Sequence, residues 1–502
     1  VAITNLTGAM GKTTLIGALD FDATGSKPKL SGSLALPTLD LRPFLGEKPA
    51  QGNIEPPRSL AELYRSLSVT TFDFRKLNNV DADITLGVGR WLSLPGEAKD
   101  VTLQIKLKDG MLQAPVKASI TGVSLSGTAR ADVNASPPRF DLALGTQDSD
   151  LGGLAELLLG VRGVKGHLGR FDLKLSAQGD QGSELVRRLD VRLEVDRGRF
   201  SYGNIDGGRP VEFGLDKLTL TLPAGKTMNA DMRGALLGDA FTAQLHAGAL
   251  EPTMLKGRTP LDFVLRSGAV HARIHGTLEA PAANRGSDLA FEFSAPRAGE
   301  LASWFGFKPG AEAPAALSGK TSLRENEWRL QDLSFKLGRT TLTADLARTT
   351  TEGKPLVKIR LGAEQIDVRE LESLIAQSEK KKTASERPVL DIPLLPQGID
   401  LTDSDVAVKI KRFAGIPVEV RDVSFDGRIR EGYMYPSPFA VNVADTRFNG
   451  ALLLDLRGAE PMAGLWLYAA DVDVGKLLRT LGVVRNLEAT FSEFGFNLVA
   501  RS

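Results

Sequence analysis

The stretch Val101-Thr-Leu-Gln-Ile-Lys-Leu-Lys108 alternates apolar and polar residues without a break. Successive side chains of a β-strand point to opposite faces, so this pattern predicts a strand with one apolar face and one polar face. Asp109-Gly110 follows directly, and this dipeptide is a strong signal for a two-residue hairpin turn. We therefore expect the chain to return antiparallel after residue 110. A second turn is predicted at Arg197-Gly198, after a similar alternating tract.

The same alternation recurs along the whole chain. A sheet built from such strands must bury its apolar face. It can fold over itself as a closed sandwich, or it can curl into a trough that a ligand covers. The residues predicted to line such a trough are Val101, Leu103, Ile105, Leu107, Phe171, Leu173, Leu175, Leu189, Val191, Leu193, Val195, Leu218, Leu220, Leu222, Leu289, Phe291 and Phe293.

A second kind of strand is rich in small residues and has glycine at its centre. Leu30-Ser-Gly-Ser-Leu34 and Ile274-His-Gly-Thr-Leu278 are examples, and residues 125–129 and 448–452 follow the same pattern. Glycine inside a strand marks a bulge or a sharp bend. Recurring bends of this kind would curl one long sheet across its width.

Short amphipathic helices punctuate the strands. Asp471-Val-Asp-Val-Gly-Lys-Leu-Leu-Arg-Thr-Leu-Gly482 places apolar residues at i, i+3, i+4 and i+7 from Val474. Asp473 stands at the N-cap position, and Gly482 stands where a helix stops. Related helices are predicted near residues 40, 150, 299 and 367, and a capping-box pattern at residues 59–62 predicts one more.

The positions of these helices and loops divide the chain into segments. Three β segments are predicted at residues 1–160, 161–307 and 308–377, the last ending in a helix. A charged, proline-containing surface loop follows at 378–396, and a C-terminal β segment with a short helix covers 397–502. The predicted fold is mainly β: a long, curled, mostly antiparallel sheet that forms an elongated apolar groove, with a few short amphipathic helices.

Composition limits the functions that this chain can have. A chain of 502 residues is too long for one compact core unless the fold grows along one axis. Lys and Arg number 62 against 61 for Asp and Glu, which argues against a nucleic-acid partner. Cysteine is absent, so disulfides, thiolate metal ligands and thiol nucleophiles are excluded.

Motifs for chemistry are weak. Gly8-Ala-Met-Gly-Lys-Thr13 resembles a phosphate-binding loop, but Leu6 stands where the first glycine of that motif belongs. His271 and His275 lie in a strand pattern that would hold their rings about 13 Å apart, too far to share a metal ion. No G-x-S-x-G elbow is present. We predict no catalytic residues, no metal and no cofactor, and hence a protein that is not an enzyme.

An ordered series of motifs begins at Phe72-Asp-Phe-Arg-Lys-Leu-Asn-Asn-Val-Asp-Ala-Asp-Ile-Thr-Leu86. It continues through the hairpin at 103–112 and the glycine strand at 125–132, and it ends at Asp150-Leu-Gly-Gly-Leu-Ala-Glu-Leu-Leu158. This order of short helix, V-D-A-D strand, L-x-D-G-x-L hairpin, glycine strand and D-L-x-x-L-L helix resembles the periplasmic part of the AsmA-like family of bacterial envelope proteins. Weaker similarity extends to Leu481.

The AsmA-like family is similar to the repeating β-groove, or chorein-like, lipid-transfer proteins. The resemblance implies a protein of the bacterial periplasm that moves phospholipid from the inner towards the outer membrane, with an outer-membrane or envelope protein as a further partner. It also implies an inner-membrane anchor. No apolar run approaches the ~18 residues of a membrane span, so we expect that anchor to precede Val1 in the full-length protein.

Two alternatives of a different class follow from the residues alone. The chain is a non-enzymatic scaffold or assembly factor for outer-membrane biogenesis if its exposed strand edges pair with client β proteins. An adhesin of the β-solenoid type is a third interpretation, but the sequence lacks the strict short repeat that such a fold requires.

Overall fold

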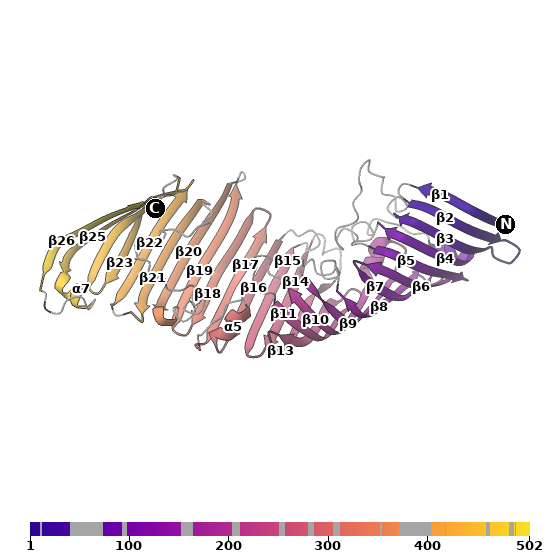
Figure 1. The fold of residues 1–502 in the computed structure, drawn as a ribbon, viewed down its shortest axis with the longest axis horizontal. Coiled ribbons are helices and arrows are strands. Elements are labelled where there is room, and N and C mark those ends of the chain that lie inside the picture. Colours follow the sequence, from indigo (N-terminus) through magenta and orange to yellow (C-terminus); the bar gives the residue numbers. More distant parts are fainter. Residues whose placement is uncertain are drawn as a thin grey trace, which may run out of the picture. The chain divides into compact units, whose positions relative to one another are not determined.

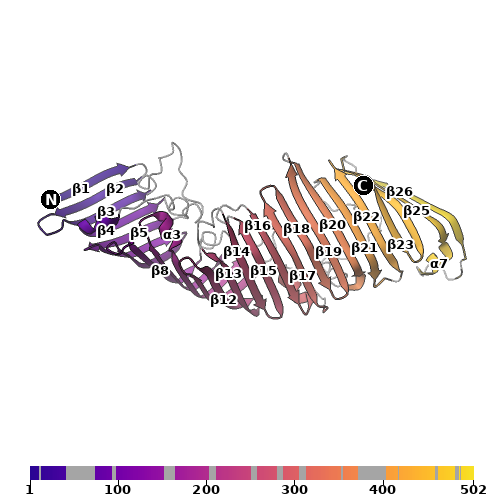
Figure 2. The ribbon, with the colours of Figure 1, turned by 180° about the vertical axis from the view of Figure 1, so that it is seen from behind.

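One β-sheet accounts for most of the chain. The computed structural model describes residues 1–10, 13–40, 74–92, 98–151, 164–202, 211–249, 257–279, 286–304, 312–351, 354–370, 403–416, 418–457, 462–480, 486 and 488–501. The strands in these ranges belong to a long, mostly antiparallel sheet of 26 strands with a few short helices (Figure 1). Figure 2 shows the strands from behind. The predicted mainly β fold with a long antiparallel sheet is therefore confirmed.

The chain forms two compact units. The first comprises residues 1–268 and 277–284, and the second comprises residues 269–276 and 285–502. These units follow spatial contacts, whereas the segments predicted from the sequence follow the positions of helices and loops. The sequence-based division at residues 160, 307, 377 and 396 stays a prediction.

The first unit begins with β1 and continues to β14. Its strands are β1 (Ala2–Met10), β2 (Thr13–Asp22), β3 (Lys29–Leu39), β4 (Asp81–Trp91), β5 (Ala98–Lys108), β6 (Met111–Ile120), β7 (Val123–Asp132), β8 (Arg139–Asp150), β9 (Val164–Gln178), β10 (Asp190–Tyr202), β11 (Val211–Leu222), β12 (Thr227–Leu236), β13 (Asp239–Ala249) and β14 (Arg258–Ser267). The helices η2 (Phe74–Asn79) and α3 (Gly182–Arg187) belong to it as well. From β4 to β14 each strand pairs antiparallel with the next.

The second unit contains the strands that follow, including the first part of β15. They are β15 (Val270–Glu279), β16 (Gly286–Ala295), β17 (Ala315–Arg324), β18 (Glu327–Leu337), β19 (Thr340–Thr351), β20 (Lys354–Asp367), β21 (Asp403–Ala414), β22 (Val420–Arg430), β23 (Tyr433–Val443), β24 (Thr446–Asp455), β25 (Met462–Asp473) and β26 (Thr490–Arg501). The helices α5 (Ala298–Trp304) and α7 (Val474–Thr480) lie between strands of this unit.

One predicted turn is confirmed and one is wrong. Asp109 and Gly110 have φ angles of 48° and 75° and join β5 to β6, as a two-residue hairpin turn requires. Arg197 and Gly198 instead lie inside β10, where Arg197 has a φ of 55° and interrupts the register with β9 and β11. The reason is that positive φ serves a strand bulge as well as a turn, and the local sequence does not separate the two.

The expected curl of the sheet is not present, and a groove is not shown. The glycines that suggested bending instead mark places where neighbouring backbones come close together. A Cβ built on Gly127 would lie 1.8 Å from the carbonyl oxygen of Ala143 on the next strand. The corresponding distances are 2.2 Å for Gly32, 2.1 Å for Gly276 and 2.1 Å for Gly450, each to a carbonyl oxygen of another strand.

The helix prediction is confirmed where the structure describes it. Helix α7 starts directly after Asp473, whose Oδ1 accepts the backbone N–H of Lys476 over 2.7 Å. Helix α5 corresponds to the helix predicted near residue 299. Residues 368–370 are helical after Asp367. The helices predicted after residues 40 and 150 and at 59–62, and the loop at 378–396, lie outside the described residues.

Each unit contains a parallel pair of neighbouring strands, β3 with β4 and β20 with β21. The chain leaves the first strand of each pair at a buried aspartate, Asp40 or Asp367. In both cases the aspartate N–H donates over 2.9 Å to Oγ1 of a buried threonine 27 residues earlier, Thr13 or Thr340. The same arrangement at both crossovers indicates that the two units share a structural repeat.

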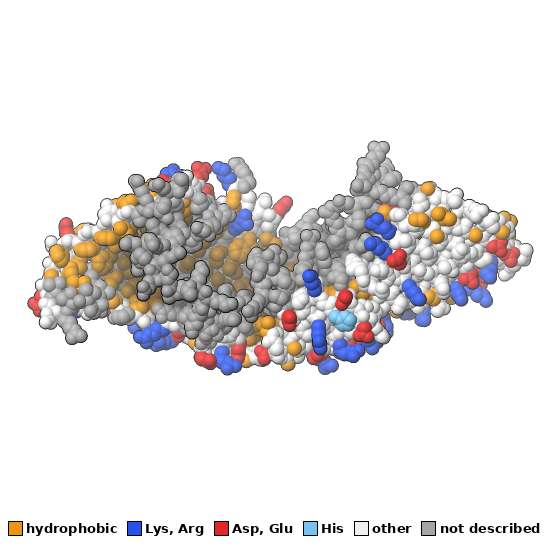
Figure 3. All heavy atoms as spheres, in the orientation of Figure 1, with side chains coloured by type: hydrophobic (Ala, Val, Ile, Leu, Met, Phe, Trp, Pro, Cys, Tyr) orange, Lys and Arg blue, Asp and Glu red, His pale blue; other side chains and the backbone are white. Residues whose placement is uncertain are grey.

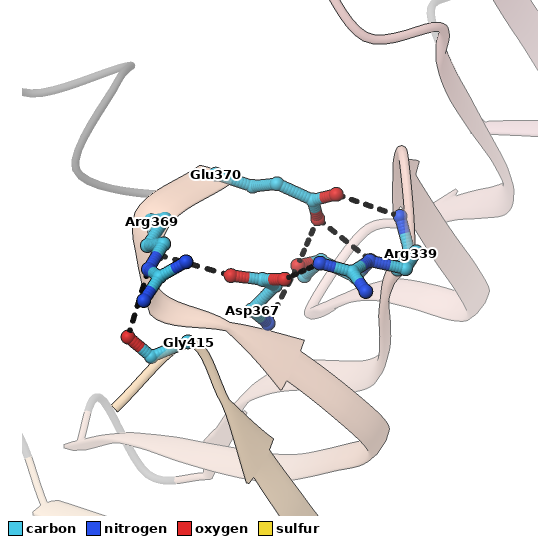
Figure 4. A network of polar contacts seen from close by, with 6 residues as sticks. Arg339, Asp367, Arg369, Glu370 and Gly415 are labelled. Atoms are coloured by element: carbon cyan, nitrogen blue, oxygen red, sulfur yellow. Dashed lines mark hydrogen bonds and ion pairs between the residues drawn. The ribbon is translucent and has the colours of Figure 1, made fainter. Parts of the chain in front are cut away.

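Figure 4 shows the polar network at the second crossover. Arg339 Nη2 donates to Asp367 Oδ2 over 2.5 Å, and the backbone N–H of Arg369 donates to Asp367 Oδ1 over 3.2 Å. Glu370 accepts the backbone N–H groups of Arg339 and of the residue after it, each over 3.0 Å. Arg369 Nε donates to the carbonyl of Gly415 over 3.2 Å. These bonds anchor the point where the chain leaves β20.

Candidate functional site: the apolar face of the sheet

In the first unit, strand register aligns apolar residues into a row that crosses the strands. Residues directly opposite each other on neighbouring strands share a face of the sheet. Following the pairs from β3 to β14 therefore traces one face, which we call the N-terminal apolar row. It consists of Leu34, Leu86, Leu103, Val116, Gly127, Leu144, Leu173, Leu193, Leu220, Ala230, Leu245 and Phe263.

Burial is uneven across this face. On β5, Val101 and Leu107 are 3% and 5% exposed, whereas Leu103 and Ile105 between them are half-buried. The apolar residues on one side of the row form packed clusters. One cluster contains Val123, Leu125, Leu151, Leu168, Phe171, Val195, Leu215, Phe241 and Ala243, with Leu173 and Leu193 of the row packed against it. Apart from the buried Val116 and Ala230, the row is therefore a half-buried strip beside a packed apolar cluster.

The residues predicted to line the trough fall into two groups, one buried and one half-buried. Val101, Leu107, Phe171, Val195 and Leu222 are buried. The remaining members, Leu103, Ile105, Leu173, Leu175, Leu189, Val191, Leu193, Leu218, Leu220, Leu289, Phe291 and Phe293, are half-buried. Register brings those on β5, β9, β10 and β11 to one face of the first unit, while those on β16 belong to the second unit. Their contact with lipid stays a prediction.

A cavity lies on this face beside η2, which contributes Phe74 and Leu77 to its lining. The ring of Phe74 in η2 is 4.6 Å from the ring of Phe140 on β8, measured between centroids. The cavity has a volume of about 390 Å³. Its apolar lining residues are Phe74, Leu77, Leu112, Ala129, Ala131, Phe140, Leu142, Leu175, Ala177 and Leu189. The volume falls within the range of small-molecule sites.

The second unit carries a similar row with more aromatic residues, the C-terminal apolar row. It runs from β16 to β26 through Phe291, Gly319, Leu333, Ala344, Leu361, Val408, Phe425, Phe439, Gly450, Leu467 and Phe496. Leu361 and Phe496 are 43% and 44% exposed. Hydrophobic side chains gather over the C-terminal strands in the space-filling view (Figure 3). Apolar surface is thus open to solvent in this unit too.

The opposite face of the sheet is ionic. Arg170 and Asp172 pair over 2.5 Å on β9, and Arg192 and Glu194 pair over 2.8 Å on β10. The two partners of each pair are residues i and i+2 of one strand, so they share a face. They alternate with Leu173 and Leu193 of the apolar row, so that face is the one opposite to the row. Because neither apolar row contains a titratable side chain, a ligand lying on it would meet only non-directional contacts.

No family model, no curated protein and no solved structure matches the chain. The similarity to the AsmA-like family therefore remains a prediction from the sequence motifs. Within the described ranges, no helix is long and apolar enough to cross a membrane, and no group of three or more acidic or histidine side chains could hold a metal ion.

Sequence reasoning missed several residues of the site. Phe74 and Leu77 cover the cavity from a 3-10 helix, and nothing in their local pattern predicts contact with β8. Leu245 and Phe263 extend the N-terminal apolar row to β13 and β14. Leu245 lies between Gln244 and His246, so alternation could have identified it, whereas Phe263 is followed by the apolar Val264 and Leu265, which hide the pattern.

Proposed function

We propose that this protein is a periplasmic lipid-transfer protein that carries phospholipid acyl chains along its apolar rows between the inner and outer membranes of a bacterium. The observation that carries the proposal is the N-terminal apolar row, which is continuous by register and half-buried at every member except the buried Val116 and Ala230. A row of leucine, valine and phenylalanine side chains accepts alkyl chains without selecting among them. The motif series that resembles the AsmA-like family supports the periplasmic location and an inner-membrane anchor.

The energy available on such a face is sufficient for lipid retention. Moving one CH₂ group out of water contributes about 0.8 kcal/mol, so a sixteen-carbon chain gains roughly 10 kcal/mol before ordering costs. The cavity beside η2 is lined almost entirely by apolar side chains and suits part of an acyl chain. Because the contacts are non-directional, a bound chain can slide from one strand to the next. This mode of action needs no catalytic residue and no cofactor.

Native mass spectrometry of protein purified without detergent tests the proposal. We expect co-purified phospholipid on the wild-type chain. Leu103→Asp and Ile105→Asp place a charge on half-buried positions of the face, and both should lower the bound lipid severalfold while the fold persists. Gln104→Asp is the matched control, because residue 104 lies between them, is exposed and points to the ionic face.

Two results would contradict lipid carriage. One is a wild-type chain that carries no phospholipid, even after incubation with vesicles. The other is complete unfolding of Leu103→Asp, observed by circular dichroism, because a closed dry core loses its fold when a charge is buried in it. Equal lipid content in Leu103→Asp and Gln104→Asp would likewise show that the face does not hold the lipid.

The edge strand β26 supports a second candidate function, the scaffold for outer-membrane biogenesis. Among the described strands, β26 pairs with β25 alone. Phe491, Leu498 and Val499 are 51%, 49% and 55% exposed. An exposed apolar edge strand is a template for adding a strand from another chain. If the chain acts as a scaffold through β26, Val499→Lys should abolish cross-linking to client β-strand peptides and leave the amount of co-purified lipid unchanged. Cross-linking that persists would exclude this edge.

A further inference from the structure

A row of cations crosses the ionic face of the first unit, opposite to the apolar row. Register pairs Lys217 of β11 with Arg233 of β12, Arg233 with Thr242 of β13, and Thr242 with Arg266 of β14. Arg233, Thr242 and Arg266 are exposed, and Lys217 is half-buried. Lys217 and Arg233 are like charges directly opposite each other, a placement that destabilises a sheet.

Acidic partners are scarce at this row. On β10, Asp196 lies opposite Lys217, but Arg233 has no carboxylate opposite it on either neighbouring strand. Within the described ranges, no ion pair joins Lys217, Arg233 or Arg266 to an acidic side chain. This differs from the strand arginines that pair with a nearby acid, such as Arg192 with Glu194.

The surface at this row is hollowed. A depression of about 450 Å³ is lined by Lys217, Thr219, Asp231, Met232, Arg233, Thr242, Ala243, Gln244, Val264 and Arg266. Asp231 supplies the carboxylate of the depression, and it accepts Nε2–H of Gln244 over 3.2 Å. Three cations therefore surround the depression against one carboxylate that is already hydrogen-bonded.

We propose that Lys217, Arg233, Thr242 and Arg266 form a binding site for the phosphate group of an anionic ligand. Guanidinium groups bind phosphate oxygens through paired N–H donors, and a lysine adds a point charge. Arg233 and Arg266 are two strand spacings apart, about 10 Å, so both long side chains reach an anion above Thr242. The threonine hydroxyl supplies a neutral donor between them. This site is independent of the lipid-carrying function, since it lies on the other face.

The test uses the full chain and inorganic orthophosphate. Isothermal titration at constant ionic strength should detect binding to the wild type, and thermal unfolding should shift to higher temperature with orthophosphate relative to chloride. Arg233→Gln should weaken orthophosphate binding by roughly tenfold or more. Arg329→Gln is the matched control, because that strand arginine pairs with Glu327 over 2.7 Å and lies outside the depression.

A second readout separates a binding site from a solvated surface. Without phosphate and at low salt, Arg233→Gln should unfold at a higher temperature than the wild type, because it removes the like charge opposite Lys217. Orthophosphate should reverse that order. The proposal is overturned if the wild type binds no orthophosphate at about 10 mM, or if Arg233→Gln binds it as well as Arg329→Gln does.

Binding to vesicles distinguishes a lipid headgroup from a soluble phosphorylated molecule as the source of the phosphate group. Retention on phosphatidic-acid vesicles, but not on phosphatidylcholine vesicles, that is lost in Arg233→Gln would identify a lipid headgroup as the ligand. Binding of orthophosphate without retention on either vesicle would identify a soluble phosphorylated molecule.

Discussion

At the scale of single residues, several glycines inside strands occupy positions that leave no room for a side chain. The Cβ position of Gly127 lies 1.8 Å from the carbonyl oxygen of Ala143 and 2.7 Å from its carbonyl carbon. These are backbone atoms of the next strand, which cannot rotate away as a side chain would. The recurrence of such glycines in both units indicates that tight strand contact, rather than flexibility, accounts for this glycine pattern.

A pair of alanine substitutions tests this interpretation. Gly127→Ala should destabilise the protein by about 2–3 kcal/mol, because the backbone of β7 or β8 must move to admit the methyl group. Gly87→Ala on β4 is the control, since nothing lies within 4 Å of its Cβ position. We expect Gly87→Ala to change stability by less than about 1 kcal/mol. Urea unfolding followed by circular dichroism measures both, and equal midpoints would refute the close-contact interpretation.

One carboxylate outside the apolar face has a strongly shifted pKa. Hydrogen bonds from the Arg457 side chain and backbone N–H lower the pKa of Asp455 from 3.8 to about 2. The Arg457 guanidinium also lies 4.5 Å from the ring centroid of Tyr433. A lowered folded-state pKa contributes stability above the unfolded pKa of 3.8, and that contribution is lost as the pH falls through about 2.

NMR titration of the Asp455 carboxyl carbon should therefore give a midpoint near pH 2. In Arg457→Gln the midpoint should move up towards 3.8, because the charged donor is gone. A wild-type midpoint near 3.8 would show that the pair does not form in solution.

At the scale of elements, the hairpin at Asp109-Gly110 could be predicted from local sequence, whereas the bulge at Arg197 and the parallel crossovers could not. Alternation at 101–108 followed by Asp109-Gly110 contains all that is needed to define β5 and its turn. The chain leaves β20 for its parallel partner β21 at Asp367, which is hydrogen-bonded to Thr340, 27 residues earlier. Strand alternation reads the same for parallel and antiparallel neighbours, so no local pattern distinguishes them.

For the candidate site, the sequence predicted which residues share a face but not how deeply each one is buried. Alternation correctly assigned Val101 and Leu103 to one face of β5, yet Val101 is 3% exposed and Leu103 is half-buried. Their burial differs because Val101 belongs to a packed cluster with Leu36, Leu39 and Val88, whereas Leu103 lies at the margin of that cluster. A period-two pattern identifies a face but carries no information about what covers it.

We expect the buried threonine at the second crossover to contribute strongly to the stability of that crossover. Thr340 is fully buried, and its hydroxyl accepts the N–H of Asp367 and donates to Glu370 over 2.7 Å. Thr340→Val keeps the side-chain shape but removes the acceptor of the Asp367 N–H and one of the donors to Glu370, which still accepts two backbone N–H groups. We expect this change to cost about 1–3 kcal/mol. Thr102→Val on the exposed face of β5 should be nearly neutral.

Chemical denaturation and hydrogen exchange together check this prediction. Thr340→Val should lower the midpoint and speed exchange of the Asp367 amide, which loses its acceptor. If Thr340→Val behaves like Thr102→Val in both measurements, the threonine–aspartate contact does not anchor the crossover.

At the scale of the whole molecule, the length of each apolar row sets how much lipid the chain can hold. The N-terminal apolar row crosses the sheet from β3 to β14, a span of about 50 Å at ~4.8 Å per strand. One leaflet of a bilayer core is about 15 Å thick, so the row is roughly three acyl chains long. The same arithmetic applies to the C-terminal apolar row, which runs from β16 to β26.

A continuous row and a set of separate pockets then predict different behaviour. If lipid slides along the row, native mass spectrometry should show more than one phospholipid per chain, and a charge at the middle of the row should divide it. Leu193→Asp, at a half-buried position near the centre, should slow lipid transfer between vesicles by roughly tenfold or more. It should lower the bound lipid no further than Leu103→Asp does, because the strands on either side keep their apolar residues. Glu194→Asp, on the ionic face of the same strand, is the control. Loss of bound lipid in proportion to transfer would mean that the row acts as one pocket rather than as a path.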